Sequence, residues 1–188
     1  MSKNRISFGS ISFVLLIILM GTGLISCQEK PTSAEKVYVD TLYFKLKGDL
    51  KALNIDPQEL QARKDELVHT MYPMVQDTFG DLRSAFEDDF NGMRTAYDTY
   101  LNKHLLYTSA TNLLIEEVEE FRKDVDADAL SRAEFKERYN ALLVKVKANN
   151  AKVEEIAKPV YDLEPMWIRL KLKFDPKRDR RDSLISKK

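Results

Sequence analysis

The fold is decided by residues 93–125, MRTAYDTYLNKHLLYTSATNLLIEEVEEFRKDV, and residues 135–163, FKERYNALLVKVKANNAKVEEIAKPVYDL. In the first run, seam residues recur in alternating steps of four and three at Met93, Tyr97, Tyr100, His104, Tyr107, Thr111, Leu114, Val118, Phe121 and Val125. The second run does the same at Phe135, Tyr139, Leu142, Val146, Asn149, Val153, Ile156, Val160 and Leu163. Sustained heptad spacing predicts two helices packed along a coiled-coil seam.

A short turn separates the two runs. Asp126 to Asp128 are turn-forming residues, and Ser131 with Glu134 forms a capping box that starts a new helix. When the chain is folded back at this turn, the seam residues pair so that their numbers sum to 256 or 257, as for Phe121 with Phe135 and Tyr107 with Asn149. The sequence therefore predicts an antiparallel helical hairpin.

Two further helices are predicted before the hairpin. The first covers about residues 34–53, and Asp56-Pro57 then provides an N-cap and a first-turn proline for a second. This second helix is expected to end at Asn91-Gly92 and to kink at Pro73, whose ring removes a backbone donor. Its apolar stripe is Leu60, Leu67, Met71, Val75, Leu82, Phe86 and Phe90. Four such helices predict an all-α fold, an elongated up-and-down helical bundle.

The C-terminal part follows a different pattern. Pro159 is expected to bend or end the last helix near Lys158. Beyond Pro165, apolar residues alternate with basic ones at Ile168, Leu170, Leu172 and Phe174, which predicts an extended segment. Residues 169–188 hold 9 Lys and Arg against 3 Asp and Glu, whereas residues 27–168 hold 19 against 27. We expect a basic, partly disordered tail that either contacts an anionic surface or folds back on the acidic bundle, and we favour the second.

The N-terminal residues have the three parts of a secretory signal. Lys3 and Arg5 precede an apolar run over residues 11–20, and small residues follow. That run is too short to cross a hydrocarbon core, which needs about 20 apolar residues. The tetrapeptide Leu24-Ile25-Ser26-Cys27 resembles the lipobox of bacterial lipoprotein precursors. The resemblance implies cleavage before Cys27, a diacylglycerol on its sulfur and an acyl chain on its nitrogen.

This resemblance accounts for the only cysteine in the chain and sets the expected organisation. Residues 1–26 are then a signal peptide, 27–33 a lipidated N-terminus and linker, 34–168 the helical bundle domain and 169–188 the tail. Gln28 is not the aspartate that resembles an inner-membrane retention signal, so the outer membrane is the expected location. Whether the domain faces the periplasm or the cell surface is open.

The candidate site within the bundle is a polar core layer of His104, Tyr107 and Asn149. Such a layer either fixes the alignment of the hairpin or binds a ligand, and alignment is the favoured interpretation. The aromatic residues Tyr97, Tyr100, Tyr107 and Tyr139 are expected in the core rather than in a small-molecule cleft. Glu66 and His69 have a spacing that metal-binding bundles use, but no second copy exists, so His69 is expected to face solvent.

The composition, 44% hydrophobic and 32% charged over 188 residues, is typical of one soluble domain. The sequence contains no Gly-x-Ser-x-Gly elbow, glycine-rich phosphate loop or cysteine and histidine cluster, so we predict no enzyme, metal or cofactor beyond the lipid on Cys27. Nucleic acid is not an expected partner. The prediction is a membrane-anchored envelope lipoprotein that binds another envelope protein, and the alternative is a small-ligand-binding lipoprotein that uses the layer around His104 and Asn149.

Overall fold

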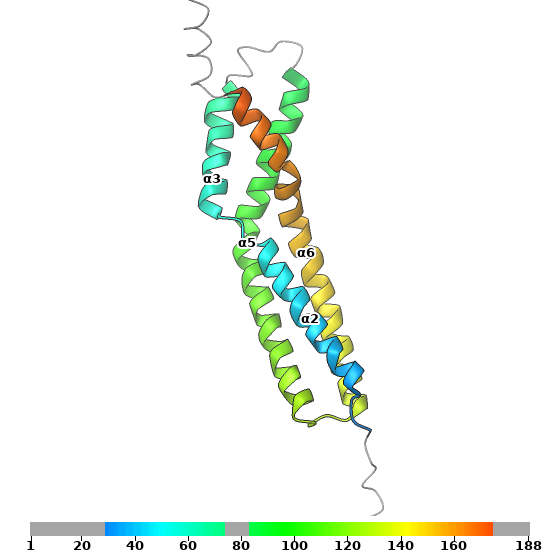
Figure 1. The fold of residues 1–188 in the computed structure, drawn as a ribbon. Helices are drawn as coiled ribbons and strands as arrows, with labels where there is room; N and C mark the ends of the chain where they lie inside the picture. The colour runs from blue at the N-terminus through cyan, green and yellow to red at the C-terminus, as the bar shows by residue number, and fades with distance from the viewer. Residues whose placement is uncertain (1–28, 74–82, 175–188) are drawn as a thin grey trace, which may run out of the picture.

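Three long helices and one shorter helix make up the part of the chain that the computed structural model describes, residues 29–73 and 83–174. They are α2 (Ser33–Ala52), α3 (Pro57–Glu66) with the π-helical segment η1 (Leu67–Met71), α5 (Arg83–Asp126) and α6 (Arg132–Lys173). Figure 1 shows α5 and α6 as a long hairpin, with α2 along its lower half and α3 along its upper half. The predicted all-α, elongated bundle is confirmed.

The hairpin forms as the heptad pattern predicts. Ser131 accepts from the backbone N–H of Glu134, and the Glu134 carboxylate accepts from the N–H of Ser131, which completes the capping box at the start of α6. Asp128 has a φ of 50° in the turn, a conformation that Asp adopts more readily than most residues. Beside the turn, the rings of Phe121 and Phe135 lie 5.4 Å apart, so the first predicted pair is confirmed.

The break between α2 and α3 lies at the predicted place, and two tyrosines from the hairpin complete its hydrogen bonds. Tyr100 donates its hydroxyl to the carbonyl of Leu53 at 2.5 Å, and Tyr161 donates to the carbonyl of Ala52 at 3.1 Å. Asp56 caps α3 by accepting from the N–H of Gln58 at 2.8 Å. These bonds supply partners for backbone groups that a helix end leaves free.

The prediction that a helix ends at Asn91-Gly92 is wrong, because α5 begins at Arg83 and passes through both residues. The reason is the continuity of the buried face: Phe90 and Met93 are 3% and 0% exposed and extend the seam on both sides of Gly92. Burial of that face outweighs the turn preference of Asn-Gly. Val75 and Leu82 of the predicted stripe lie outside the described residues.

The helix that begins at Pro57 changes character before Pro73. From Leu67 to Met71 it is π-helical, and the N–H of Tyr72 donates to the carbonyl of Leu67, five residues back. Such segments widen a helix by one residue per turn. The described helix ends at Pro73. The residues after the expected kink lie outside the described part of the chain.

The prediction of an extended segment after Pro165 is also wrong. Helix α6 continues through Pro159 and Pro165 to Lys173, so the bundle does not end at residue 168. Trp167, Leu170 and Phe174 continue the steps of three and four and are buried, whereas Ile168 and Leu172 are exposed. Burying three large side chains contributes about 1.5–3 kcal/mol each, enough to offset prolines that each cost about 3 kcal/mol. In Figure 1 the end of α6 leans toward α3.

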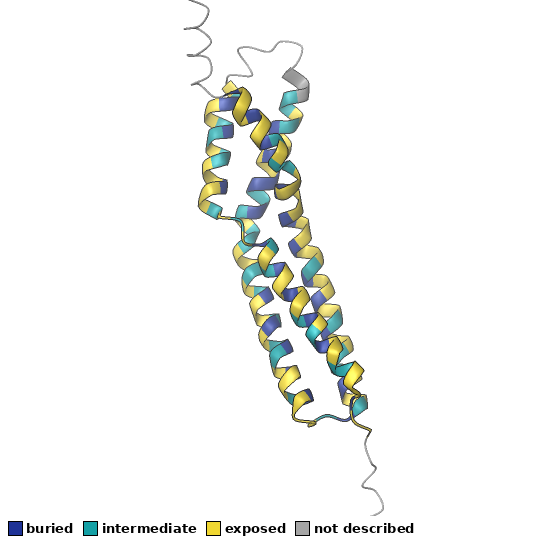
Figure 2. Cartoon of the chain, in the orientation of Figure 1, coloured by how far each residue is buried: buried dark blue, intermediate teal, exposed yellow. Residues whose placement is uncertain are grey.

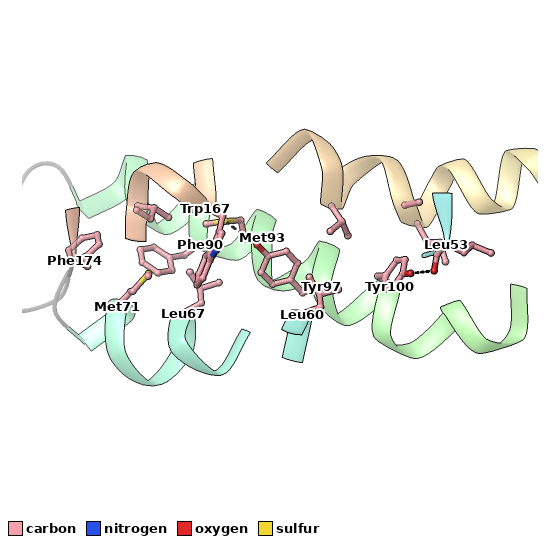
Figure 3. Close-up of a cluster of buried hydrophobic side chains, with 14 of the residues drawn as sticks. Leu53, Leu60, Leu67, Met71, Phe90, Met93, Tyr97, Tyr100, Trp167 and Phe174 are labelled. Carbon is pink, nitrogen blue, oxygen red and sulfur yellow. Dashed lines mark hydrogen bonds between the residues drawn. The ribbon is translucent and has the colours of Figure 1, made fainter. Parts of the chain in front are cut away.

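The core consists of two clusters. Figure 2 shows buried residues along each of the helices, alternating with exposed ones. The cluster at the α3 end is aromatic and includes Phe90, Met93, Tyr97 and Trp167, which Figure 3 shows between α5, α6 and the α3–η1 helix. The cluster at the turn end is built from α2, α5 and α6 and includes Leu42, Leu46, Val118, Phe121 and Phe135. The junction between these clusters is polar.

Candidate functional site

A buried hydrogen-bonded layer crosses the bundle between the two clusters. It contains Asp49 of α2, Thr111 of α5 and Asn149 of α6, which are 3%, 0% and 6% exposed. The amide nitrogen of Asn149 lies 3.0 Å from Oδ2 of Asp49 and 3.0 Å from Oγ1 of Thr111. Asn150 also donates to Asp49, at 2.7 Å. One side chain from each of the three long helices therefore meets at one level.

The position of this layer follows from the heptad spacing. Asn149 lies between Val146 of one cluster and Val153 of the other, and Asp49 lies between Leu46 and Leu53. A slip of either helix by one heptad would bring these polar groups against apolar side chains, where an unpaired group costs about 1–3 kcal/mol. The layer therefore aligns the helices, as buried polar residues do in coiled coils.

The layer differs in membership from the one expected at His104, Tyr107 and Asn149. His104 is half-buried, stacks on the ring of Tyr100 at 5.3 Å, and its Nδ1 lies 3.1 Å from the carbonyl of Leu101 in its own helix. Tyr107 joins the layer only through its backbone carbonyl, which accepts from Thr111 at 2.7 Å. Asp49 was not among the expected residues, although its place between Leu46 and Leu53 is a signal that could have revealed it.

On the side facing solvent, the layer borders an open groove between α2 and α6. The groove has a volume of about 470 Å³ and is lined by Asp49 and Asn150, by Lys45 and Lys158, and by the small residues Gly48 and Ala157. Asn149 and Thr111 do not line it. Among the described residues, every buried side-chain nitrogen or oxygen has a hydrogen-bond partner. The layer is thus closed by packing at its centre.

A second polar cluster holds the segment that precedes α2 against the α5–α6 turn. The N–H of Arg132 donates to the carbonyl of Glu29 at 2.6 Å, and its guanidinium lies 3.1 Å from the Glu29 carboxylate. Lys30 donates to the carbonyl of Asp128 at 2.8 Å, and Lys36 forms an ion pair with the Asp128 carboxylate at 2.8 Å. We call these contacts the N-terminal clamp. The clamp means that residues 29–32, part of the expected linker, are folded onto the bundle.

Glu35 links the clamp to the first turn of α2. Its carboxylate accepts from the backbone N–H of Thr32 at 2.9 Å and from Nε of Arg132 at 3.0 Å. These interactions lower the pKa of Glu35 from 4.5 to about 2; the Thr32 N–H is the largest cause, burial opposes it, and Arg132 adds to it. The carboxylate is therefore ionised at neutral pH.

The lowered pKa predicts an acid-dependent loss of stability. Because the folded state holds this proton less tightly than the unfolded state, Glu35 stabilises the fold fully above about pH 4.5, and the contribution is lost as the pH falls toward about 2. We expect the difference in unfolding free energy between wild type and Glu35→Gln to stay constant above about pH 5 and to shrink below it. Urea unfolding at a series of pH values measures this. An equal difference at pH 3 and pH 6 contradicts it.

The other predicted residues lie as follows. His69 is exposed on η1, as expected, and Tyr97 and Tyr100 are 1% and 0% exposed in the aromatic cluster. Tyr107 and Tyr139 are half-buried. Within residues 29–73 and 83–174, no group of three or more His, Cys, Asp and Glu is placed to hold a metal ion. Cys27 lies outside the described residues.

None of the helices in the described ranges combines the length and the apolar character that a membrane span requires. Comparison of the chain with protein-family models, with curated proteins and with solved structures finds no match.

Proposed function

We propose that this protein is a bacterial envelope lipoprotein, anchored to the membrane through a lipid on Cys27, and that its helical bundle is a non-enzymatic module for binding another envelope protein. The lipobox-like tetrapeptide Leu24-Ile25-Ser26-Cys27 and the absence of any other cysteine in the sequence motivate the anchor. Two acyl chains or more give stable attachment, because each buried methylene contributes about 0.8 kcal/mol.

The N-terminal clamp is the observation that carries the proposal. Glu29, the first described residue, already contacts the bundle. The backbone N–H of Arg132 donates to its carbonyl, and the Arg132 guanidinium pairs with its carboxylate. Only Gln28 separates Glu29 from Cys27, and two residues span at most about 7 Å. A chain cut before Cys27 therefore keeps every contact described above, and its lipid would sit directly beside the α5–α6 turn.

The shape of the bundle supports a role in contact with a partner at a distance. Helix α6 has 42 residues, which corresponds to about 63 Å at 1.5 Å per residue. With the α5–α6 turn held near the bilayer, the end of α6 at Lys173 stands about that far from the anchor if the bundle is upright. A rod of this length can connect a membrane to a second component.

Labelling with palmitate tests the anchor. We expect wild type to carry the label, to lack residues 1–26 and to fractionate with membranes. Cys27→Ser should abolish the label. Label on the Cys27→Ser chain, or an unlabelled wild type that still begins with Met1, contradicts the proposal.

Capture from cross-linked, solubilised envelopes tests the interaction. The control for the basic tail is a chain that ends at Phe174, because Trp167, Leu170 and Phe174 belong to the core and an earlier end would damage the fold. Recovery of the same envelope protein with both chains places recognition on the bundle. If neither chain recovers an envelope protein above the level of a lipidated control protein, the binding module is rejected.

A further inference from the structure

Helix α5 carries a second heptad stripe on its outer side. From Thr99, steps of four and three lead through Lys103, Leu106, Ala110, Leu113 and Glu117 to Glu120. Leu106 and Leu113 are both 65% exposed, and the neighbouring Leu105 is 71% exposed. Two exposed leucines one heptad apart are typical of a helix face that packs against another helix.

Ion pairs locate this stripe on the side of α5 next to α6 and away from α2. Lys103 lies 3.1 Å from Glu155 of α6, and Glu117 forms an ion pair with Lys145 of α6. The contact with α2 is made from another side of α5, where Arg122 lies 3.2 Å from Asp40. The stripe therefore belongs to the face of the hairpin that α2 leaves uncovered.

The α6 side of the same face carries apolar and small residues. Val144 is 68% exposed there, and the exposed small residues Ala141, Ala148 and Ala151 lie on neighbouring turns. The stripe continues toward the start of α5, where Gly92, Ala96 and Thr99 line a groove of about 430 Å³ with Pro159 of α6. Small side chains along both helices let another helix approach closely.

The stripe carries a positive charge at one end and a negative charge at the other, so it is complementary to an antiparallel copy of itself. Ala110 is its midpoint, with Lys103 seven residues before and Glu117 seven residues after. If two copies of α5 lie antiparallel with Ala110 at the centre, Lys103 of one copy meets Glu117 of the other, and Leu106 meets Leu113. A parallel pair would instead place Lys103 on Lys103 and Glu117 on Glu117, and facing like charges are unfavourable.

We propose that two copies of this chain associate antiparallel through the outer stripe of α5, centred on Ala110. The stripe from Thr99 to Glu120 is about 32 Å long, and the two helices of the hairpin are together about 20 Å wide. Such a face covers about 600 Å² per copy, or about 1,200 Å² in total, the lower limit of specific interfaces. The two copies form a two-fold dimer with a leucine centre and an ionic pair at each end. Because the α5–α6 turns then lie at opposite ends of the dimer, lipids on both copies reach one bilayer only when the two rods lie along its surface rather than upright.

Sedimentation of the full chain in density-matched detergent tests the dimer. We expect a concentration-dependent mass between one and two chains for wild type. Leu106→Glu with Leu113→Glu should raise the dimer dissociation constant at least tenfold, whereas Phe44→Glu, on a phenylalanine that is 69% exposed on α2, should leave it unchanged. Equal melting temperatures of the variants would show that each monomer remains folded. A wild type that stays monomeric at millimolar concentration, or loss of the dimer only in Phe44→Glu, overturns the proposal.

A charge exchange distinguishes the two orientations. Lys103→Glu with Glu155→Lys, which keeps an ion pair within the chain, should weaken an antiparallel dimer, and adding Glu117→Lys with Lys145→Glu should restore it. If the exchange fails to restore association, the antiparallel arrangement is wrong. The stripe contains none of residues 1–28, so these results do not depend on whether Cys27 carries a lipid, and the dimer and the anchor can fail separately.

Discussion

Phe121→Ala is expected to lower the free energy of unfolding by about 4 kcal/mol, because removing a fully buried phenylalanine ring leaves a cavity that neighbouring side chains fill only in part. Phe121 is 0% exposed, its ring lies 5.4 Å from that of Phe135, and the guanidinium of Arg138 lies 5.0 Å from its centroid. Both contacts join α5 to α6 beside the turn. Denaturant unfolding measures the change.

The same substitution at Phe44 is the control. Phe44 is 69% exposed on α2, so Phe44→Ala should change the unfolding free energy by no more than about 0.5 kcal/mol. Similar effects of the two substitutions would show that the hairpin does not pack with the register described.

Asn149→Ala is expected to destabilise the bundle by about 3 kcal/mol, because it removes the donor between Asp49 and Thr111 and leaves buried polar atoms without that partner. Asn140→Ala, on an exposed asparagine of the same helix, is the matched control and should have little effect. Unfolding of the two variants side by side measures the difference. A loss below 0.5 kcal/mol for Asn149→Ala would mean that water replaces the missing amide without cost.

Most of the fold could be predicted because the hairpin seam repeats over many heptads. A single misplaced residue does not disturb such a pattern, and the capping box of Ser131 and Glu134 and the Asp56-Pro57 pair mark helix starts that the structure confirms. The errors occurred where one local signal was weighed against the seam. Asn91-Gly92, Pro159 and Pro165 all favour a helix end locally, but each is flanked by residues that continue a buried face.

The alternation after Pro165 misled for a related reason. Ile168, Leu170, Leu172 and Phe174 also fit two sides of a helix, and the decisive residue was Trp167, which extends the steps of three and four from Val160 and Leu163. A short apolar run contains both periods, so only its continuity with the preceding helix decides.

The polar layer was predictable in part. Asn149 is recognisable in the sequence as a polar residue on the seam. Its partners, however, depend on how a third helix packs, and the heptad pattern relates only the two helices of the hairpin. Asp49 enters from α2, and the Asn149 amide donates to its carboxylate and to the hydroxyl of Thr111. The N-terminal clamp could not be anticipated, since Glu29 and Arg132 are 103 residues apart and no periodicity relates them.

The N-terminal clamp also has a mechanical consequence. Tension between the N-terminal end of the chain and the far end of the rod would enter the bundle at Glu29, where Arg132 connects α2 directly to the start of α6. The force is therefore shared between α2 and α6. It acts along their length, so all the contacts between them must break at the same time. Without the clamp the load would fall on α2 alone and could strip it from the hairpin one turn at a time.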